Sequence, residues 1–134
     1  MKYLITCALP YANGELHLGH IFEGIQADIY AKNKKLLGHK VNMICGSDSH
    51  GTPIMLNAEK QSISPEALIH KYQEKHSSQY KKFNINFDHF GNTHSETNRK
   101  YVEKFFLELK NKGYIFTKDV DGFYDTSKNM FLPD

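Results

Sequence analysis

The sequence predicts an α/β fold in which a parallel sheet is flanked by helices. Three observations lead to this prediction. A short apolar run, residues 3–8, is followed after a turn by a long amphipathic run, residues 16–37. A second apolar run, residues 41–45, comes directly afterwards. Strand, helix and strand in this order form a β-α-β unit, whose crossover is almost always right-handed.

The two apolar runs have the composition of buried parallel strands. Residues 3–8 read Tyr-Leu-Ile-Thr-Cys-Ala, and residues 41–45 read Val-Asn-Met-Ile-Cys. A parallel strand covered on both faces is apolar along its length, whereas a half-buried strand alternates. We therefore expect the first run to be a central strand and the second to be its buried neighbour.

The helix predicted over residues 16–37 carries apolar side chains at a three-to-four residue spacing, which indicates one buried face. Lys34 and Lys35 occupy its last turn, and Gly38 is a typical stop signal. The residues expected on the buried face are Leu18, Ile21, Phe22, Ile25 and Ile29.

Two further helices are predicted after the second strand. A short helix covers residues 54–60, and a longer one starts at Ser64, a good N-cap, with Pro65 at its first position. Residues 84–90 form a loop whose alternating apolar residues allow a brief strand. The inner face expected for the longer helix consists of Leu68, Ile69, Tyr72, His76 and Tyr80.

In the last third of the chain, the sequence predicts one helix and two short strands. Thr93 and Glu96 have the spacing of a capping box, opening a helix that runs to about Lys112. Residues 114–118 and 122–125 are expected to be strands around an Asp-Gly turn. The expected core face of the helix consists of Tyr101, Val102, Phe105, Phe106 and Leu109.

Composition excludes several classes of protein. The 134 residues suit one domain, and a net charge of +2 is too small to indicate nucleic-acid binding by itself. No apolar run approaches the roughly 18 residues of a membrane span. The chain enters a strand at once, which leaves no room for a signal peptide and predicts a cytoplasmic protein. Cys7 and Cys45 are therefore expected to be reduced, buried thiols, without the spacing of metal ligands.

The run of residues 10–20, Pro-Tyr-Ala-Asn-Gly-Glu-Leu-His-Leu-Gly-His, is the most informative part of the sequence. A strand that leads into a helix through such a turn offers free N–H groups and a positive dipole end to a phosphate. His17 and His20 would both project from the first helical turn, and Gly19 would let a ligand approach the backbone. The alternatives are a structural or surface histidine pair, or a zinc site that needs two more ligands. The run predicts a nucleotide site.

A second polar group follows the second strand, where Asp48 and His50 stand in a loop flanked by Gly46 and Gly51. Open α/β sheets bind ligands outside the carboxyl ends of their strands. Residues 8–11 and 46–48 both lie at such ends, so we expect them to meet in one crevice. The alternative is that Asp48 caps the next helix or forms an Asx turn, and that the glycines merely serve the turn.

These runs resemble the signatures of a known family. Residues 10–20 resemble the nucleotide-binding "HIGH" motif of class I aminoacyl-tRNA synthetases, with Leu18 in its second position. Residues 46–53, Gly-Ser-Asp-Ser-His-Gly-Thr-Pro, look like the form found in the methionyl-tRNA synthetase family. Residues 130–134 are similar to the stretch before that family's zinc-binding insertion. The resemblance implies a Rossmann-like fold: residues 1–116 would be the first half of the catalytic domain, and 117–134 the truncated start of the connective insertion.

The resemblance also implies a reaction and its participants. The family joins methionine to its tRNA in two steps, through a methionyl-adenylate formed when the amino acid carboxylate attacks the α-phosphate of ATP. The implied ligands are ATP with Mg²⁺, methionine and tRNA, with zinc expected only in the missing insertion and no metal on these residues. In the first step the protein contributes mainly positioning and charge stabilisation.

The same resemblance assigns roles to individual residues. His17 and His20 would act as catalytic donors to the ATP phosphate oxygens. The methionine ammonium group would bind the Asp48 carboxylate, a charge-assisted contact. The ATP-binding set would be Asn13, Gly14, His17, Gly19 and His20, and the methionine-binding set would be Ala8, Leu9, Tyr11 and Asp48.

The sequence also departs from the family pattern. The second signature, Lys-Met-Ser-Lys-Ser, does not occur in these 134 residues, nor do the second half of the fold, the zinc ligands or an anticodon-binding domain. We therefore expect this portion to be inactive on its own. Two other interpretations remain open: a nucleotidyltransferase with His-x-Gly-His on its first helix, and a non-catalytic nucleotide-binding remnant.

Overall fold

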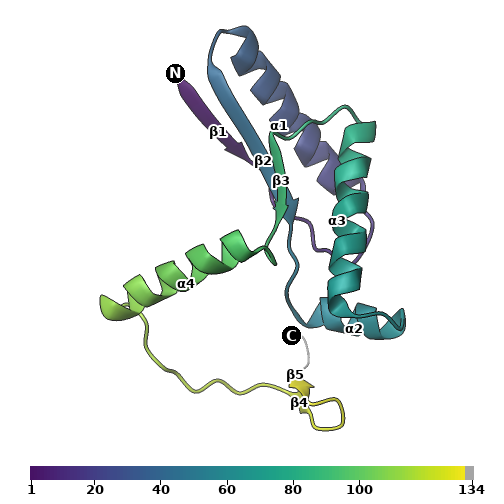
Figure 1. Ribbon diagram of the computed structural model, residues 1–134, viewed down its shortest axis with the longest axis vertical. Coiled ribbons are helices and arrows are strands. Elements are labelled where there is room, and N and C mark those ends of the chain that lie inside the picture. The colour runs from purple at the N-terminus through teal and green to yellow at the C-terminus, as the bar shows by residue number, and fades with distance from the viewer. Residues whose placement is uncertain (132–134) are drawn as a thin grey trace.

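The computed structural model describes residues 1–131. Residues 132–134, part of the stretch that resembles the start of the zinc-binding insertion, lie outside the described residues. Figure 1 shows the elements in chain order. They are β1 (Lys2–Thr6), α1 (Leu18–Leu36), β2 (Lys40–Ser47), α2 (Thr52–Lys60), α3 (Pro65–Lys82), β3 (His89–Asn92), α4 (Glu96–Asn111), β4 (Tyr124–Asp125) and β5 (Met130–Phe131).

The main sheet is parallel, with the strand order β1-β2-β3. Its register pairs Thr6 with Ile44 and Ser47 with Asn92. The predicted β-α-β unit and the α/β fold class are confirmed. A brief third strand is present, but at residues 89–92, so it overlaps only the end of the predicted loop of residues 84–90. The position of β1 was predicted wrongly: β2 is the central strand, and β1 pairs only with β2 among the described residues. Leu4 is consequently 68% exposed.

The core lies between the sheet and two helices. Both crossovers run in the same direction across the sheet, so right-handed connections place α1 and α3 over the same face. Val41 and Met43 of β2 pack there with Ile21 of α1 and Tyr80 of α3. The hydrophobic effect of burying these side chains is what holds the β-α-β unit together.

The buried face of α1 differs from the prediction. Ile21 is buried and Ile25 packs against the core, but Leu18, Phe22 and Ile29 are exposed. The face of α1 that is buried instead contains Gly24, Asp28 and Ala31. The reason is the size of Gly24, which lets Tyr80 of α3 approach the helix backbone: an added Cβ would lie 2.9 Å from the Tyr80 ring.

The middle helices agree with the prediction. Pro65 occupies the first turn of α3, and the Ser64 side chain accepts a hydrogen bond from the N–H of Ala67 at 3.1 Å. Helix α2 begins two residues earlier than expected. The inner face of α3 is buried as predicted, at Leu68, Ile69, Tyr72, His76 and Tyr80.

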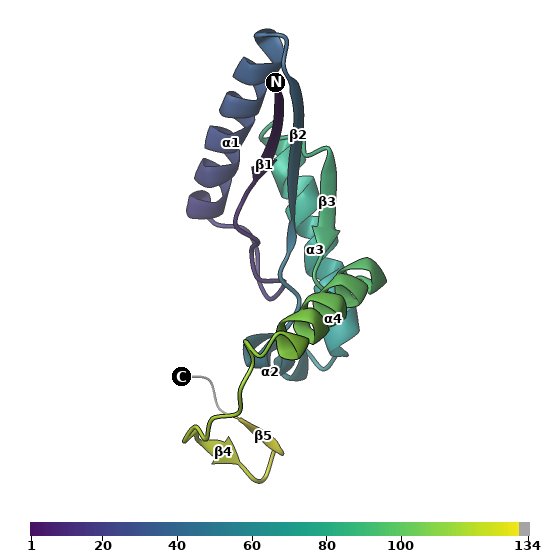
Figure 2. The same cartoon turned by 90° about the vertical axis from the view of Figure 1, so that its left-hand side faces the viewer.

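Helix α4 corrects two predictions. Its N-cap is Ser95, which accepts from the N–H of Asn98, whereas Thr93 is used elsewhere. The helix leads away from the end of the sheet (Figure 1), and in the turned view it lies below the sheet (Figure 2). No residue of α4 is buried. An amphipathic face needs a partner, and the described residues supply none. The apolar side chains expected in the core, Tyr101, Val102, Phe105, Phe106 and Leu109, are about half exposed.

The strands at the end of the described chain also differ from the prediction. Residues 114–118 form no strand, and Tyr124 of β4 pairs with Phe131 of β5, so the turn is residues 126–129 instead of Asp-Gly at 121–122. The Asp125 carboxylate explains this choice, because it accepts from the N–H groups of Ser127 and Lys128. Such Asx geometry stabilises a turn locally.

Among residues 1–131, no helix combines the length and the apolar character that a membrane span demands.

Because Tyr80 packs against Gly24, we expect a larger side chain at position 24 to destabilise the fold. Gly24→Leu should destabilise the fold by about 1–3 kcal/mol, as overpacking of a tight core does. Gln26→Leu, on the exposed side of the same helix, should stay within about 0.5 kcal/mol. Urea unfolding followed by circular dichroism measures both, and equal stabilities for the two variants would refute the packing described for Gly24.

Candidate functional site

The candidate site lies where β1 and β2 end. Here Tyr11 and Asp48 form a parallel bridge that joins the two loops. The N–H of Asp48 donates to the Pro10 carbonyl at 2.8 Å, and the N–H of Ala12 donates to the Asp48 carbonyl at 2.7 Å. The structure therefore brings together the two sequence runs that were expected to share one crevice.

The Asp48 side chain takes part in a hydrogen-bond network with Thr93, the residue that follows β3. Its Oδ1 accepts a hydrogen bond from the Thr93 hydroxyl at 3.3 Å, and Thr93 Oγ1 accepts one from the N–H of Ser49 at 2.8 Å. The alternative role as a helix cap does not apply, because the N-cap of α2 is Gly51 and has no side-chain cap. The Asp48 side chain is half-buried at the end of the sheet, and the Thr93 hydroxyl donates the one side-chain hydrogen bond described for its carboxylate.

His17 and His20 form a capping box at the start of α1. His17 is the N-cap, and its Nδ1 accepts from the N–H of Gly19 at 3.1 Å. His20 Nδ1 accepts in turn from the N–H of His17 at 3.2 Å. The two rings stack, with centroids 3.7 Å apart and 20° between their planes. The histidines thus take the part that Ser and Glu usually have in this motif.

The capping box determines where the imidazole protons are. A backbone N–H only donates, so each Nδ1 that accepts from one carries no proton, and a neutral ring then has its proton on Nε2. Burial, and next the neighbouring His17 and His76, lower the pKa of His20. The helix start therefore presents two Nε2–H donors with fixed orientation, which suits an anionic oxygen.

Gly19 has a more specific role than the expected access for a ligand. A Cβ at this position would lie 2.9 Å from Cε1 and 3.0 Å from Nδ1 of His17. The His17 ring folds back over residue 19, so a side chain there would displace it. By contrast, a Cβ on Gly14 would meet nothing within 4 Å.

Side chains of α2 and α3 hold the turn before α1. The Asn13 carbonyl accepts from the side chain of Asn57, and the N–H of Leu16 donates to Gln79 at 3.3 Å. Glu15 forms an ion pair with Lys75. The Gly14 carbonyl lies 2.8 Å from Nε2 of His76. The turn is thus ordered by the neighbouring helices before any ligand arrives.

The residues assigned to methionine line the end of β1. The N–H of Ala8 donates to Glu23 of α1 at 2.7 Å. Leu9 and Tyr11 are 45% and 49% exposed, and Tyr11 lies beside Gly51. Leu9 also lines a cavity of about 190 Å³. The other walls of this cavity come from the ends of β1, β2 and β3, from Thr93 and from Asn98 of α4.

The two cysteines are free and buried, as expected. They occupy adjacent strand ends, and the Cys45 thiol donates to the Ala8 carbonyl at 3.6 Å. Hydrogen bonding with Cys45, and next burial, raise the pKa of the Cys7 thiol. A thiol of this kind is a poor nucleophile.

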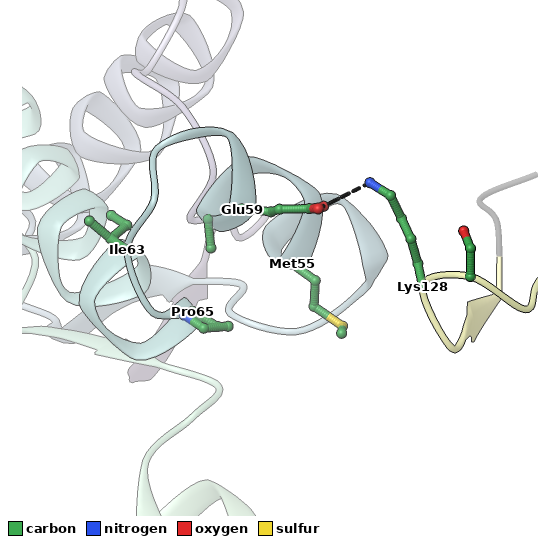
Figure 3. Close-up of a pocket in the computed structure, with 7 residues that line it drawn as sticks. Met55, Glu59, Ile63, Pro65 and Lys128 are labelled. Atoms are coloured by element: carbon green, nitrogen blue, oxygen red, sulfur yellow. Dashed lines mark hydrogen bonds and ion pairs between the residues drawn. The ribbon is translucent and has the colours of Figure 1, made fainter.

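Another cavity, of about 450 Å³, lies between α2 and the β4–β5 hairpin (Figure 3). It is lined by Met55, Ile63 and Pro65 and bordered by the ion pair between Lys128 and Glu59 at 3.0 Å. None of the site residues predicted from the sequence lines it. Within residues 1–131 no group of three or more His, Cys, Asp and Glu side chains is placed to hold a metal ion.

Sequence reasoning missed several residues that support this site, among them Glu23, Asn57, Gln79, Thr93 and, in its polar role, His76. Thr93 was read as a helix cap, although its place after the third parallel strand could have indicated the same edge as Asp48. Glu23, Asn57 and His76 show no local signal, because each acts on backbone far away in the sequence.

The parallel sheet and the helices that pack on it define a Rossmann-like α/β domain. Residues 3–134 match the model of the family described as tRNA synthetases class I (M), so the chain belongs to that family.

Solved structures agree with this assignment. Two methionyl-tRNA synthetase structures from Mycobacterium tuberculosis, both with methionyl-adenylate, align with a TM-score of 0.88 at 25% identity. They cover 98% of this chain, which spans 26% of theirs. A structure of the agnB2 LeuRS of Agrobacterium radiobacter K84, in a ternary complex with tRNA and LeuAMS, also aligns with this chain. Its TM-score is 0.84 at 25% sequence identity, and the alignment covers 98% of this chain and 17% of the LeuRS chain.

Because the His17 ring lies against residue 19, we expect a methyl group added at Gly19 to disturb the helix cap. Gly19→Ala should displace the His17 ring and weaken the cap, at a cost of about 0.5–2 kcal/mol. Gly14→Ala is the matched control and should leave the cap intact. Imidazole ¹⁵N chemical shifts report whether His17 Nδ1 still accepts a hydrogen bond, and an unchanged shift in Gly19→Ala would contradict the capping geometry.

The lowered pKa of His20 predicts a pH dependence. In the folded chain His20 should titrate below its ordinary value of about 6.5, so between the two pKa values the unfolded state binds more protons. The free energy of unfolding should therefore fall as the pH drops below about 7, and less steeply in His20→Gln. NMR titration of the His20 ring and urea unfolding at several pH values measure these effects; a pKa above 6.5 would count against the account.

Proposed function

We propose that this chain provides the ATP- and methionine-binding part of a methionine–tRNA ligase. The supporting observation is the joining of two loops at the ends of β1 and β2. One loop carries two Nε2–H donors at a helix N-terminus, and the other carries the half-buried Asp48 carboxylate. An adenylate of an amino acid requires this pair of functions, a phosphate site beside an ammonium site.

In the proposed reaction, the methionine carboxylate attacks the α-phosphate of ATP in line and pyrophosphate leaves. Asp48 receives the methionine ammonium group and thereby orients the carboxylate. His17 and His20 donate their Nε2 protons in hydrogen bonds to phosphate oxygens as negative charge accumulates. A hydroxyl of the tRNA terminus then takes the methionyl group from the adenylate.

The remaining assignments belong to the same proposal. Asn13, Gly14 and Gly19 shape the ATP site, and Mg²⁺ enters with the phosphates of ATP, as is usual for this ion. Ala8, Leu9 and Tyr11 border the methionine side chain. We further propose that residues 117–134 begin the connective insertion, that the first 134 residues alone are inactive, and that the protein works in the cytoplasm.

The M. tuberculosis methionyl-tRNA synthetase structures contain methionyl-adenylate, which supports this choice of ligand. A nucleotidyltransferase would use a similar histidine pair but would give Asp48 no ligand. Binding measurements on the chain itself separate the two: Mg-ATP binding that methionine strengthens supports the ligase, and a nucleotide site indifferent to methionine supports the alternative.

The histidines and the aspartate should affect different steps. In a protein that carries residues 1–134 together with the lysine-serine signature, His20→Ala should slow adenylate formation about 10²–10³-fold, as loss of one oxyanion donor does. Asp48→Ala should weaken methionine binding about 10–100-fold, as loss of a charged hydrogen bond does, with little effect on ATP. Methionine-dependent exchange of pyrophosphate into ATP measures both.

Equal and small effects of the two substitutions would overturn these roles. Asp28→Ala provides a control for general destabilisation, because Asp28 is a buried carboxylate of α1 that pairs with Lys32 away from the site. The pyrophosphate-exchange kinetics of Asp28→Ala should resemble those of the unchanged protein once the fraction of folded protein is taken into account.

A further inference from the structure

A fully buried histidine on α3 connects the two loops of the site. His76 is 0% exposed, and so is its partner Ser47, the last residue of β2. The Nε2 atom of His76 lies 2.8 Å from the carbonyl oxygen of Gly14, and Nδ1 lies 3.0 Å from Oγ of Ser47. Neither catalytic nor binding roles are assigned to His76 in the proposed reaction.

The partners of His76 determine its protonation. The Gly14 carbonyl can only accept, so Nε2 carries the proton, and Nδ1 of the neutral ring accepts from the Ser47 hydroxyl. Burial lowers the pKa of His76, which keeps the ring neutral. Both ring nitrogens and the hydroxyl are thereby satisfied in a site without water access, a condition under which hydrogen bonds fix one geometry.

The two ends of this connection adjoin the reactive groups. Ser47 precedes Asp48, and Gly14 stands three residues before His17 in the turn that leads to α1. The backbone bridge at Tyr11 holds only the first part of that turn. Its second part depends on side chains of α2 and α3. Of the hydrogen bonds described for these side chains, those of His76 join the turn to β2.

We propose that His76 is a positioning residue, which sets the place of the histidine-bearing helix start relative to Asp48 so that both address one ligand. The effect on catalysis rests on the proposed function, whereas the effect on the position of the turn does not depend on it. A purely space-filling histidine would be replaceable by any ring of similar volume, whereas a positioning residue requires a donor and an acceptor in the right places.

Three variants distinguish these roles. His76→Phe keeps a ring but removes both hydrogen bonds, and His76→Gln restores one donor and one acceptor on a planar amide. His70→Phe is the matched control, because His70 lies on the same helix with an exposed side chain. Should His76→Phe fail to fold, Ser47→Ala tests the same connection more gently by freeing only Nδ1.

Amide hydrogen exchange of the unliganded chain is the first measurement. His76→Phe should raise exchange at Leu16, His17 and Gly19, whose N–H groups all donate hydrogen bonds, by about tenfold over the rest of the fold, through local opening of the turn. His76→Gln should return it to within about threefold of the original chain, and His70→Phe should not change it. The proposal is overturned if exchange at these three amides stays unchanged, if it rises equally throughout α3 and β2, or if Gln gives no rescue.

Titration with Mg-ATP is the second measurement. Where the chain binds the nucleotide, affinity should fall about tenfold in His76→Phe and recover in His76→Gln, following the loss of pre-organisation. A chain that binds no Mg-ATP at all would refute the proposed function, while the exchange data would still decide whether His76 positions the turn. An affinity that is insensitive to His76→Phe despite faster exchange would overturn the positioning role in binding.

Discussion

The short backbone bridge between Tyr11 and Asp48 is the interaction on which the candidate site depends. Two hydrogen bonds, at 2.7 and 2.8 Å, continue the pairing of β1 and β2 beyond the ends of the regular strands. They bring the turn before α1 against the loop after β2, from which Asp48 projects. Because parallel strands end at the same edge of a sheet, this bridge turns two separate sequence signatures into one surface.

Around this bridge, backbone groups orient the histidine side chains, and buried side chains hold that backbone in place. The backbone at the start of α1 fixes the imidazoles, since the capping box uses both Nδ1 atoms and leaves both Nε2–H groups for a ligand. Buried polar side chains of neighbouring elements then fix the backbone, above all His76 of α3. The helix cap thus connects local sequence to chemistry: His17, Gly19 and His20 stabilise the helix start with the same atoms that orient the donors.

Much of this could be predicted from the sequence, but not all of it. The β-α-β unit and α3 follow from apolar runs, from spacing and from the Ser64 cap, which are local signals. The exposed face of α4 could not be predicted, since amphipathic spacing shows that a helix has a partner but not which residues form it. In the same way, the buried stripe of α1 depends on Gly24 meeting Tyr80, and the support of the turn depends on His76 meeting Gly14. Both are contacts between residues more than fifty positions apart, which periodicity cannot reveal.

The central claim is that the two loops bind one ligand. NMR titration of the ¹⁵N- and ¹³C-labelled chain with a stable sulfamoyl analogue of methionyl-adenylate tests this most directly. We expect one binding isotherm, with shift changes at Nε2 of His17 and His20 and at the Asp48 carboxyl carbon that share a single dissociation constant. Changes confined to one loop, or two different dissociation constants for the two loops, would contradict the account.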